Sequence, residues 1–190
     1  MSREIYVLIH AIITHSKVNG PGVRAVVYFQ GCDLGCAGCW NPATHALVGA
    51  ERSIIDDVAT QILGVVGIDG VTFSGGEPMQ QASALFALIS ILKARRPDLS
   101  IGMYSGYTER ELNASAIWRA VCEHLDFAVL GRFVAAKPSS LPLRTSANQI
   151  LRLFSGRYRE EDFQPQECEV QITQDGLVQI TGFPLAGSPA

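Results

Sequence analysis

Short strand-like segments alternate with helix-length segments through most of this 190-residue chain. Residues rich in β-branched and aromatic side chains predict strands at 25–31, 70–76, 100–106, 125–131 and 148–154. Helix-length segments separate the first four of these strands, at 53–65, 80–95 and 108–124, and Ser53 is the expected N-cap of the first. The order βαβαβαβ predicts an α/β fold with a parallel sheet, because helical crossovers connect parallel strands.

Two flanking segments stand outside this alternation. Residues 4–13, EIYVLIHAII, predict an extra strand at an edge of the sheet. Residues 167–182, ECEVQITQDGLVQITG, alternate apolar and polar side chains around Asp175 and Gly176, which predicts an appended β-hairpin. We therefore expect a core domain over residues 1–160 and a C-terminal hairpin extension over 161–190 that packs on the core.

Composition narrows the class of protein. Hydrophobic residues make up 47% of the chain, enough for one core, and the net charge of -3 provides no field that would recruit nucleic acid or an anionic membrane. No apolar run reaches the roughly 20 residues of a membrane span, and the first residues do not resemble a signal peptide, so we expect a cytoplasmic protein. Disulfides rarely persist there, so the five cysteines favour metal binding or catalysis.

Three of the cysteines lie within the segment GCDLGCAGCW, directly after the first core strand. They are Cys32, Cys36 and Cys39, with Gly35 and Gly38 between them to permit tight turns. A structural zinc site usually needs four ligands, for which His45 is the nearby candidate. A 4Fe-4S cluster held by three thiolates would leave one iron open to a substrate or cosubstrate. Unligated or redox-active thiols are the third interpretation.

A second motif, SGGEP, follows the next strand at 74–78. Its paired glycines permit backbone shapes closed to other residues and close approach of a ligand, and Glu77 offers a carboxylate to a ligand ammonium group. Alone, this pattern is also that of an ordinary strand-to-helix turn. The carboxyl ends of neighbouring parallel strands carry the chemistry of such sheets, so the cysteine motif on the preceding strand favours a functional role.

Five ordered segments resemble radical S-adenosylmethionine enzymes. Within that superfamily the chain is most similar to the activating enzymes of glycyl-radical enzymes, especially the activators of anaerobic ribonucleotide reductases. The resemblance spans about residues 17–157, and Trp40 after the third cysteine is typical of the reductase activators. The tail from about Phe163 lies beyond the usual end of short activators. The segments are VNGPGVRAVVYFQGCDLGCAGCWNP (18–42), FSGGEP (73–78), YSGYTERELN (104–113), DFAVLGRFV (126–134) and LPLRTSANQ (141–149).

The resemblance implies a partial (β/α) barrel of parallel strands in which Cys32, Cys36 and Cys39 hold a 4Fe-4S cluster. The open iron would chelate the amino and carboxylate groups of S-adenosylmethionine. The implied contacts to this cosubstrate are Ser74, Gly75, Gly76, Glu77 and Pro78 near the methionine amino group, Gly38, Cys39 and Trp40 near the adenine, Ser105 near the methionine or ribose, and Arg132 near a carboxylate or the ribose.

The implied activity is reductive cleavage of S-adenosylmethionine to a 5'-deoxyadenosyl radical that generates a glycyl radical on a large partner enzyme. A flavodoxin or ferredoxin would supply the electron, and no side chain beyond the cofactor ligands need be catalytic. Arg24, Asn148 and Gln149 are expected on the partner or substrate side. The alternatives are a radical enzyme acting on a small molecule or peptide, and a non-catalytic iron-sulfur electron carrier.

Overall fold

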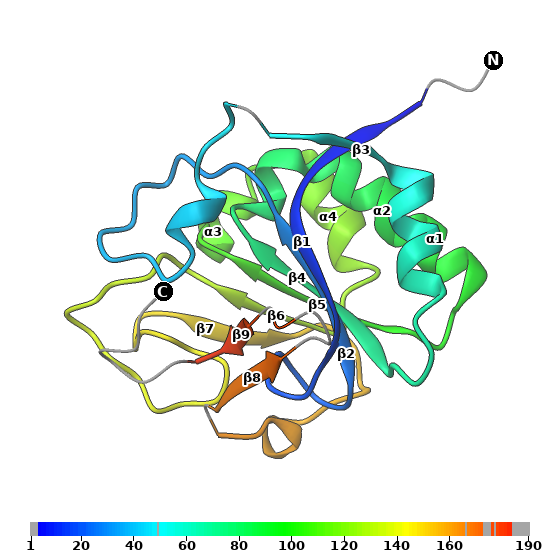
Figure 1. Cartoon of the computed structure of the whole chain (residues 1–190). Helices are drawn as coiled ribbons and strands as arrows, with labels where there is room; N and C mark the ends of the chain where they lie inside the picture. Colours follow the sequence, from blue (N-terminus) through cyan, green and yellow to red (C-terminus); the bar gives the residue numbers. More distant parts are fainter. Residues whose placement is uncertain (1–3, 49, 166, 173–175, 177, 184–190) are drawn as a thin grey trace.

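A seven-stranded sheet forms the centre of the protein, whose computed structural model describes residues 4–48, 50–165, 167–172, 176 and 178–183. The strands lie in the order β3-β1-β2-β4-β5-β6-β7 (Figure 1). Their bounds are β1 Tyr6–Ser16, β2 Arg24–Phe29, β3 Arg52–Ile54, β4 Gly70–Gly75, β5 Ser100–Ser105, β6 Phe127–Leu130 and β7 Ile150–Leu153. The pairs β2–β4, β4–β5 and β5–β6 are parallel, whereas β1, β3 and β7 pair in antiparallel fashion with their neighbours. The fold is thus mixed α/β with a parallel-rich sheet.

Helices cover one face of this sheet. Figure 1 shows α1 (Ile55–Leu63), α2 (Ala82–Arg95) and α4 (Ala116–Cys122) together on that side, while the four-residue helix α3 (Glu109–Leu112) precedes α4. Short 3-10 turns occur at Pro42–Thr44, Pro78–Gln81 and Glu160–Asp162. The main core lies between helices and sheet, where buried residues such as Leu85, Leu88 and Ile89 pack against Val27 and Phe73.

The opposite face has its own apolar cluster. Along β6, Ala128 and Leu130 belong to the helix-side core, whereas Phe127 and Val129 pack on the other face, as the alternation of a strand requires. Three residues from later in the chain join them, namely Leu143, Phe163 and Phe183. Leu143 precedes β7 and the other two follow it, so segments on both sides of β7 cover the face of the sheet that the helices leave open.

The expected alternation is confirmed for four strands, and several details differ. The strand predicted at 148–154 is β7, which lies antiparallel to β6 because no helix connects them to reverse the chain direction. The segment 4–13 forms β1, which lies between β3 and β2 and is not an edge strand. Ser53 belongs to β3, and Ile54 occupies the N-cap of α1. The helix predicted at 108–124 is divided into α3 and α4.

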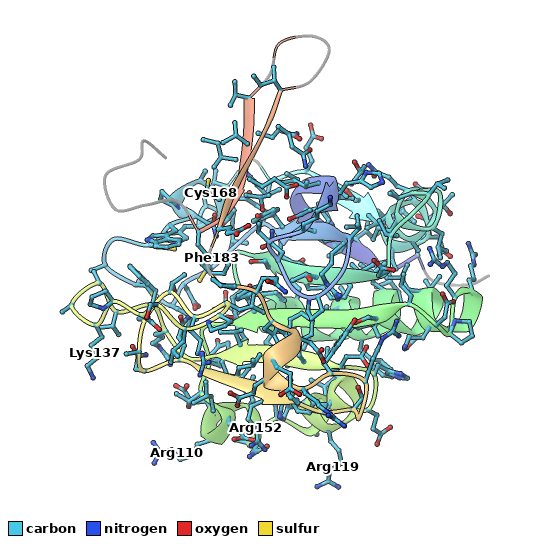
Figure 2. All side chains as sticks on the ribbon, turned by 90° about the horizontal axis from the view of Figure 1, so that it is seen from below. Arg110, Arg119, Lys137, Arg152, Cys168 and Phe183 are labelled. Atoms are coloured by element: carbon cyan, nitrogen blue, oxygen red, sulfur yellow. The ribbon has the colours of Figure 1, made fainter. Side chains whose placement is uncertain are left out.

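The predicted C-terminal hairpin is present. Strands β8 (Cys168–Ile172) and β9 (Val178–Gly182) pair in antiparallel register in a sheet of their own. Asp175 of the expected turn lies outside the described residues, and Gly176 has a left-handed φ of 84°. Figure 2 shows the hairpin standing out from the body of the protein, with Cys168 and Phe183 at its base.

Arg24 at the start of β2 is buried with no exposed surface. Its guanidinium donates to the Thr72 hydroxyl at 2.6 Å, to the Val71 carbonyl at 2.9 Å and to the Ser100 carbonyl at 3.2 Å. Its carbon Cζ also lies 5.0 Å from the centre of the Phe127 ring. Arg24 therefore connects the amino ends of three parallel strands, far along β2 from the cysteine motif that follows the strand.

Replacing Arg24 with Met should lower the free energy of unfolding by about 3 kcal/mol, because the buried acceptors lose their donor. Urea unfolding followed by circular dichroism measures this change. The matched control is Arg119→Met on α4, an exposed position where the change should stay within about 0.5 kcal/mol. Equal effects at both positions would contradict the structural role of Arg24.

Candidate functional site

The three-cysteine loop leaves the carboxyl end of β2 and is closed at its base. The Gly31 amide donates to the Thr44 carbonyl at 2.7 Å, and the Cys32 amide donates to the His45 carbonyl at 3.2 Å. The Gln30 side-chain amide also donates to the carbonyls of Ala43 and Ala46, at 3.2 and 2.6 Å. These bonds fix both ends of the loop, so its position follows that of β2.

Within the loop, the cysteines face a common cavity of about 570 Å³. Cys32, Cys36 and Cys39 are free thiols, each partly buried, and all three line it. Gly35 and Gly38 have left-handed φ values of 63° and 71°, and the Cys39 amide donates to the Cys36 carbonyl at 3.2 Å. Among the described residues no three His, Cys, Asp or Glu side chains converge on one metal-ion position. The cysteines of a 4Fe-4S cluster each bind a different iron, so they need no such convergence.

Electrostatics show that the thiols influence one another. Burial raises the pKa of Cys32 and Cys39 above the ordinary value, and backbone amides at Leu34 and Asn41 partly offset this. The charges of Glu77, Cys39 and Cys36 raise the pKa of Cys32 further. Without a metal Cys32 and Cys39 are therefore protonated near neutral pH, and iron must displace their protons to bind.

The paired glycines of SGGEP pack against the start of the cysteine loop. Gly75 has a φ of 96°, and a Cβ there would lie 2.6 Å from the Phe29 nitrogen. A Cβ at Gly76 would collide with the Gly31 carbonyl oxygen. The Gly76 amide donates to Phe29 O at 2.8 Å, and the Glu77 amide donates to Gly31 O at 2.9 Å. The protein backbone itself therefore requires glycine at both positions, which agrees with the special backbone shape expected from the sequence.

Glu77 is buried, with 1% of its surface exposed, and connects the ends of two parallel strands. Its carboxylate accepts from Met79 N at 2.9 Å, from the Ser105 hydroxyl at 2.9 Å and from Gly106 N at 2.7 Å. Burial raises its pKa to about 7 in spite of these donors. A carboxylate offers about four acceptor positions. Glu77 lines the cavity and keeps capacity for one further donor.

An aromatic wall closes another side of the cavity. The Trp40 ring lies 5.9 Å from Phe133 and 6.2 Å from Phe183, measured between ring centres, and all three residues line the cavity. Trp40 comes from the cysteine loop, Phe133 from the segment after β6, and Phe183 directly follows β9. The C-terminal hairpin therefore contributes directly to this site.

Most of the site residues expected from the sequence do meet at this cavity, and several lie outside it. Gln149 lines the cavity, and its amide donates to Gly131 O at 3.0 Å. The Arg132 guanidinium pairs with Glu111 at 2.8 Å and is not part of the lining. Asn148 donates to Arg132 O, also outside the lining. Those in the lining are Cys32, Cys36, Cys39, Trp40, Ser74, Gly75, Gly76, Glu77, Ser105 and Gln149, and those outside it are Arg24, Gly38, Pro78, Arg132 and Asn148.

Sequence reasoning missed several residues of the lining. Tyr28 and Tyr104 project from β2 and β5, on either side of Ser74 in β4, which pairs in register with Tyr28. The Tyr28 hydroxyl lies 2.7 Å from the Thr181 hydroxyl, which also accepts from Asn19 at 2.7 Å. The Tyr104 hydroxyl is buried and has no hydrogen-bond partner among the described residues. Strand alternation would have placed both tyrosines on the face of Ser74, whereas nothing local predicts Thr181 there.

Comparison with known proteins identifies the family. The family described as a 4Fe-4S single cluster domain matches residues 18–152. The anaerobic ribonucleoside-triphosphate reductase-activating protein of Vibrio cholerae is 33% identical over 145 residues, which are 73% of this chain and 92% of that protein. The protein of the same name from Escherichia coli strain K12 is 30% identical, over 70% of this chain and 90% of its own length. This chain belongs to the family of these activating proteins.

Two further matches cover a smaller part of the chain. The pyruvate formate-lyase-activating enzyme of Clostridium pasteurianum is 37% identical over 90 residues, 45% of this chain and 38% of that enzyme. The crystal structure of QueE from Escherichia coli covers 54% of each chain with a TM-score of 0.46 and 19% identity, too loose a likeness to argue from. As a radical S-adenosylmethionine activating enzyme, the activating protein uses a 4Fe-4S cluster and S-adenosylmethionine. The non-catalytic carrier alternative is thereby set aside.

The residues of the cavity fit these cofactors. Three thiols on one anchored loop supply the donor set of a cluster with one open iron. The unpartnered Tyr104 hydroxyl and the remaining acceptor capacity of Glu77 offer polar contacts to a bound molecule. Of the other cysteines, Cys122 packs beside the helix-side core and Cys168 is exposed, so neither adds a ligand to this cavity.

Gly76→Ala should reduce the iron bound after anaerobic reconstitution by about half or more, because the new methyl group displaces Gly31 and with it the cysteine loop. Iron and sulfide analysis of the purified protein measures the loss. Gly156→Ala is the matched control, since a Cβ there meets nothing within 4 Å. Full iron content in Gly76→Ala would show that the loop does not depend on this contact.

Proposed function

We propose that this activating protein installs a glycyl radical on a large partner enzyme of the anaerobic ribonucleoside-triphosphate reductase type. The observation that carries the proposal is the gathering of three thiols, the Gly75–Gly76 turn and Glu77 around one cavity at the carboxyl ends of neighbouring parallel strands. The names of the relatives support the partner class. The partial barrel expected from the sequence would let such a partner reach the cavity along the open side of the sheet.

In this proposal Cys32, Cys36 and Cys39 hold the 4Fe-4S cluster. A bound cluster, given one electron by a flavodoxin or ferredoxin, would supply the reductive cleavage of S-adenosylmethionine to methionine and a 5'-deoxyadenosyl radical, and this radical would take a hydrogen atom from a glycine of the partner. Glu77 accepts the methionine ammonium group with its remaining acceptor position. Ser74, Ser105 and the backbone of Gly75 and Gly76 border the same space.

The chain's own work is to position ligands and to exclude water. The bonds at the base of the cysteine loop and the contact of Gly76 with Gly31 set the position of the cluster ligands. The aromatic wall around Trp40 places an apolar surface beside Cys39, where the adenine is expected to lie. Such walls protect a carbon radical from side reactions. No acid or base is required, so we assign no catalytic residue beyond the cofactor ligands.

For four further residues expected from the sequence, we propose narrower roles. The hydrogen bond to Glu111 raises the pKa of Arg132, and the nearby Cys36 adds to this rise, so a contact to a carboxylate or ribose at the edge of the site is its proposed role. Asn148 and Gln149 are proposed to support the partner side, since Asn148 is exposed and Gln149 lines the cavity. Arg24 is buried, so any influence on the partner would act through the position of the segment 19–24.

The proposed setting is the cytoplasm, without a nucleic-acid or membrane partner. In the described part of the chain, no helix has the length and apolar character needed to cross a bilayer. One observation favours the alternative of a small-molecule or peptide substrate: β9 and Phe183 form part of the wall of the cavity. Radical formation on the reductase, detected by electron paramagnetic resonance, separates the two, because a small-molecule enzyme would leave the reductase without radical.

Replacing any one of Cys32, Cys36 or Cys39 with Ala should abolish 5'-deoxyadenosine formation and the visible absorption of the cluster, because one iron loses its thiolate. The assay is anaerobic turnover with S-adenosylmethionine and dithionite, with product measured by chromatography. Cys168→Ala, which removes an exposed thiol, is the matched control and should keep both signals. Equal loss in that control would overturn the ligand assignment.

Tyr104→Phe should raise the KM for S-adenosylmethionine or for the reductase by about tenfold, since its buried hydroxyl is available only to a bound molecule. Its free energy of unfolding should stay constant or rise, because an unpaired buried group is removed. Tyr28→Phe serves as control and should lose about 1 kcal/mol of stability with its bond to Thr181. A KM unchanged in Tyr104→Phe would show that the hydroxyl serves no ligand.

A further inference from the structure

The C-terminal hairpin turns its polar face toward the body of the protein and its apolar face toward solvent, the reverse of the usual arrangement. We call the hairpin formed by β8 and β9, Cys168–Ile172 and Val178–Gly182, the arm. A strand pair that packs on a protein usually buries its apolar side chains and leaves its polar ones in water. In the arm the polar side chains face the body, and the aliphatic ones face solvent.

Three polar residues attach the arm to the body. Glu169 accepts from the Lys17 amide at 3.1 Å, and Gln171 donates to the His15 carbonyl. Thr181 is 4% exposed and bonds with Asn19 and Tyr28, each at 2.7 Å. At the base of the arm, Phe183 packs in the apolar cluster on the open face of the sheet. These contacts hold the arm in one orientation, so its outer face is a fixed feature of the surface.

The outer face consists of two aliphatic cross-strand pairs. Val170 pairs with Ile180 and Ile172 pairs with Val178, and their exposed fractions are 57%, 46%, 74% and 60%. They are four of the eleven exposed large hydrophobic residues among those the structure describes. Figure 2 shows that they stand on an element that projects from the body. Exposed aliphatic residues gathered on a projecting hairpin are typical of an interaction surface.

The arm is continuous with the cavity. Gln179, Ile180 and Thr181 line the cavity, and Ile180 also belongs to the exposed outer face. A binding partner that covers the outer face would therefore also border the cavity at Ile180. The match to the iron-sulfur family ends at residue 152, so the arm lies outside the part of the chain that the family shares.

We propose that the arm is the docking surface for the large protein substrate, and that it holds this partner with one of its backbone loops beside Ile180 at the cavity. The inference rests on the proposed function. The partner must present an apolar patch next to a loop that carries the glycine. A small-molecule substrate would have no use for Val170, Ile172 and Val178, which lie outside the cavity lining.

The area of the outer face argues against a second copy of this chain as the occupant. A stable complex buries roughly 800 Å² on each partner. Four partly exposed aliphatic side chains supply only a part of that area. These side chains suit a larger contact that also includes the rim of the cavity. A partner that inserts a loop into the cavity would make such a contact, whereas a second arm alone would not.

The test uses the double variant Ile172→Thr, Val178→Thr in the full-length, cluster-loaded protein. Threonine keeps the β-branched shape that suits strands and removes the apolar character of a pair outside the cavity lining. Val66→Thr, at an exposed aliphatic residue between α1 and β4, is the matched control. Anaerobic sedimentation with the ribonucleoside-triphosphate reductase from the same organism measures the Kd, and 5'-deoxyadenosine formed without reductase reports on the cavity.

We expect the double variant to bind the reductase about tenfold more weakly, with cleavage of S-adenosylmethionine in the absence of reductase retained. Val66→Thr should bind as the unmodified protein does. An unchanged Kd in the double variant would overturn the docking role and leave the proposed function intact. If the activating protein self-associates, and the double variant abolishes this self-association while its binding to the reductase is unchanged, the occupant of the outer face is a second copy. Cluster-loaded unmodified protein that fails to cleave S-adenosylmethionine would instead refute the proposed function.

Discussion

The contact between two stretches of backbone determines where the chemistry of this protein is located. Strands β2 and β4 are parallel and in register, with Phe29 opposite Gly75, so their carboxyl ends stop side by side. Gly76 then approaches Gly31 so closely that a single Cβ would not fit between them. Because Gly31 directly precedes Cys32, this approach sets the first cluster ligand relative to Glu77. The cysteine motif and SGGEP are thus two sides of one backbone contact.

The parts of the fold that were predictable from the sequence are those with a local sequence pattern. Buried parallel strands are short apolar runs between helices, so β2, β4, β5 and β6 were found from composition and spacing. The direction of β7 depends on a long connection without a helix, and the place of β1 depends on which strand it pairs with across the sheet. Both are tertiary choices that leave no local pattern. Ser53 had the side chain of a helix cap, but pairing with Val7 drew it into β3.

The candidate site shows the same division. Motif spacing placed the three cysteines, Glu77 and Ser105 together, because all follow the carboxyl ends of neighbouring strands. It did not indicate that Glu77 would be buried and would accept from three donors of the protein, since this depends on Gly106 and Met79 closing around it. It also gave no sign of Thr181 or Phe183, which reach the cavity although they lie more than a hundred residues after Glu77 in the sequence. Arg132 was placed near the cofactor by its motif, whereas Glu111 holds its guanidinium outside the lining.

A radical enzyme that acts on a protein must meet two opposed requirements. Its cavity has to exclude water, yet it has to admit a segment of a large partner. Here the core provides the cluster loop, the glycine turn and most of the wall, while an appended element completes the wall with Thr181 and Phe183. That element is anchored by Phe183 in an apolar cluster and attached elsewhere by polar side chains. Since those polar groups form hydrogen bonds with the body of the protein, the aliphatic residues of the arm face outward. The element that completes the wall of the cavity is therefore also the one that can recognise the partner protein.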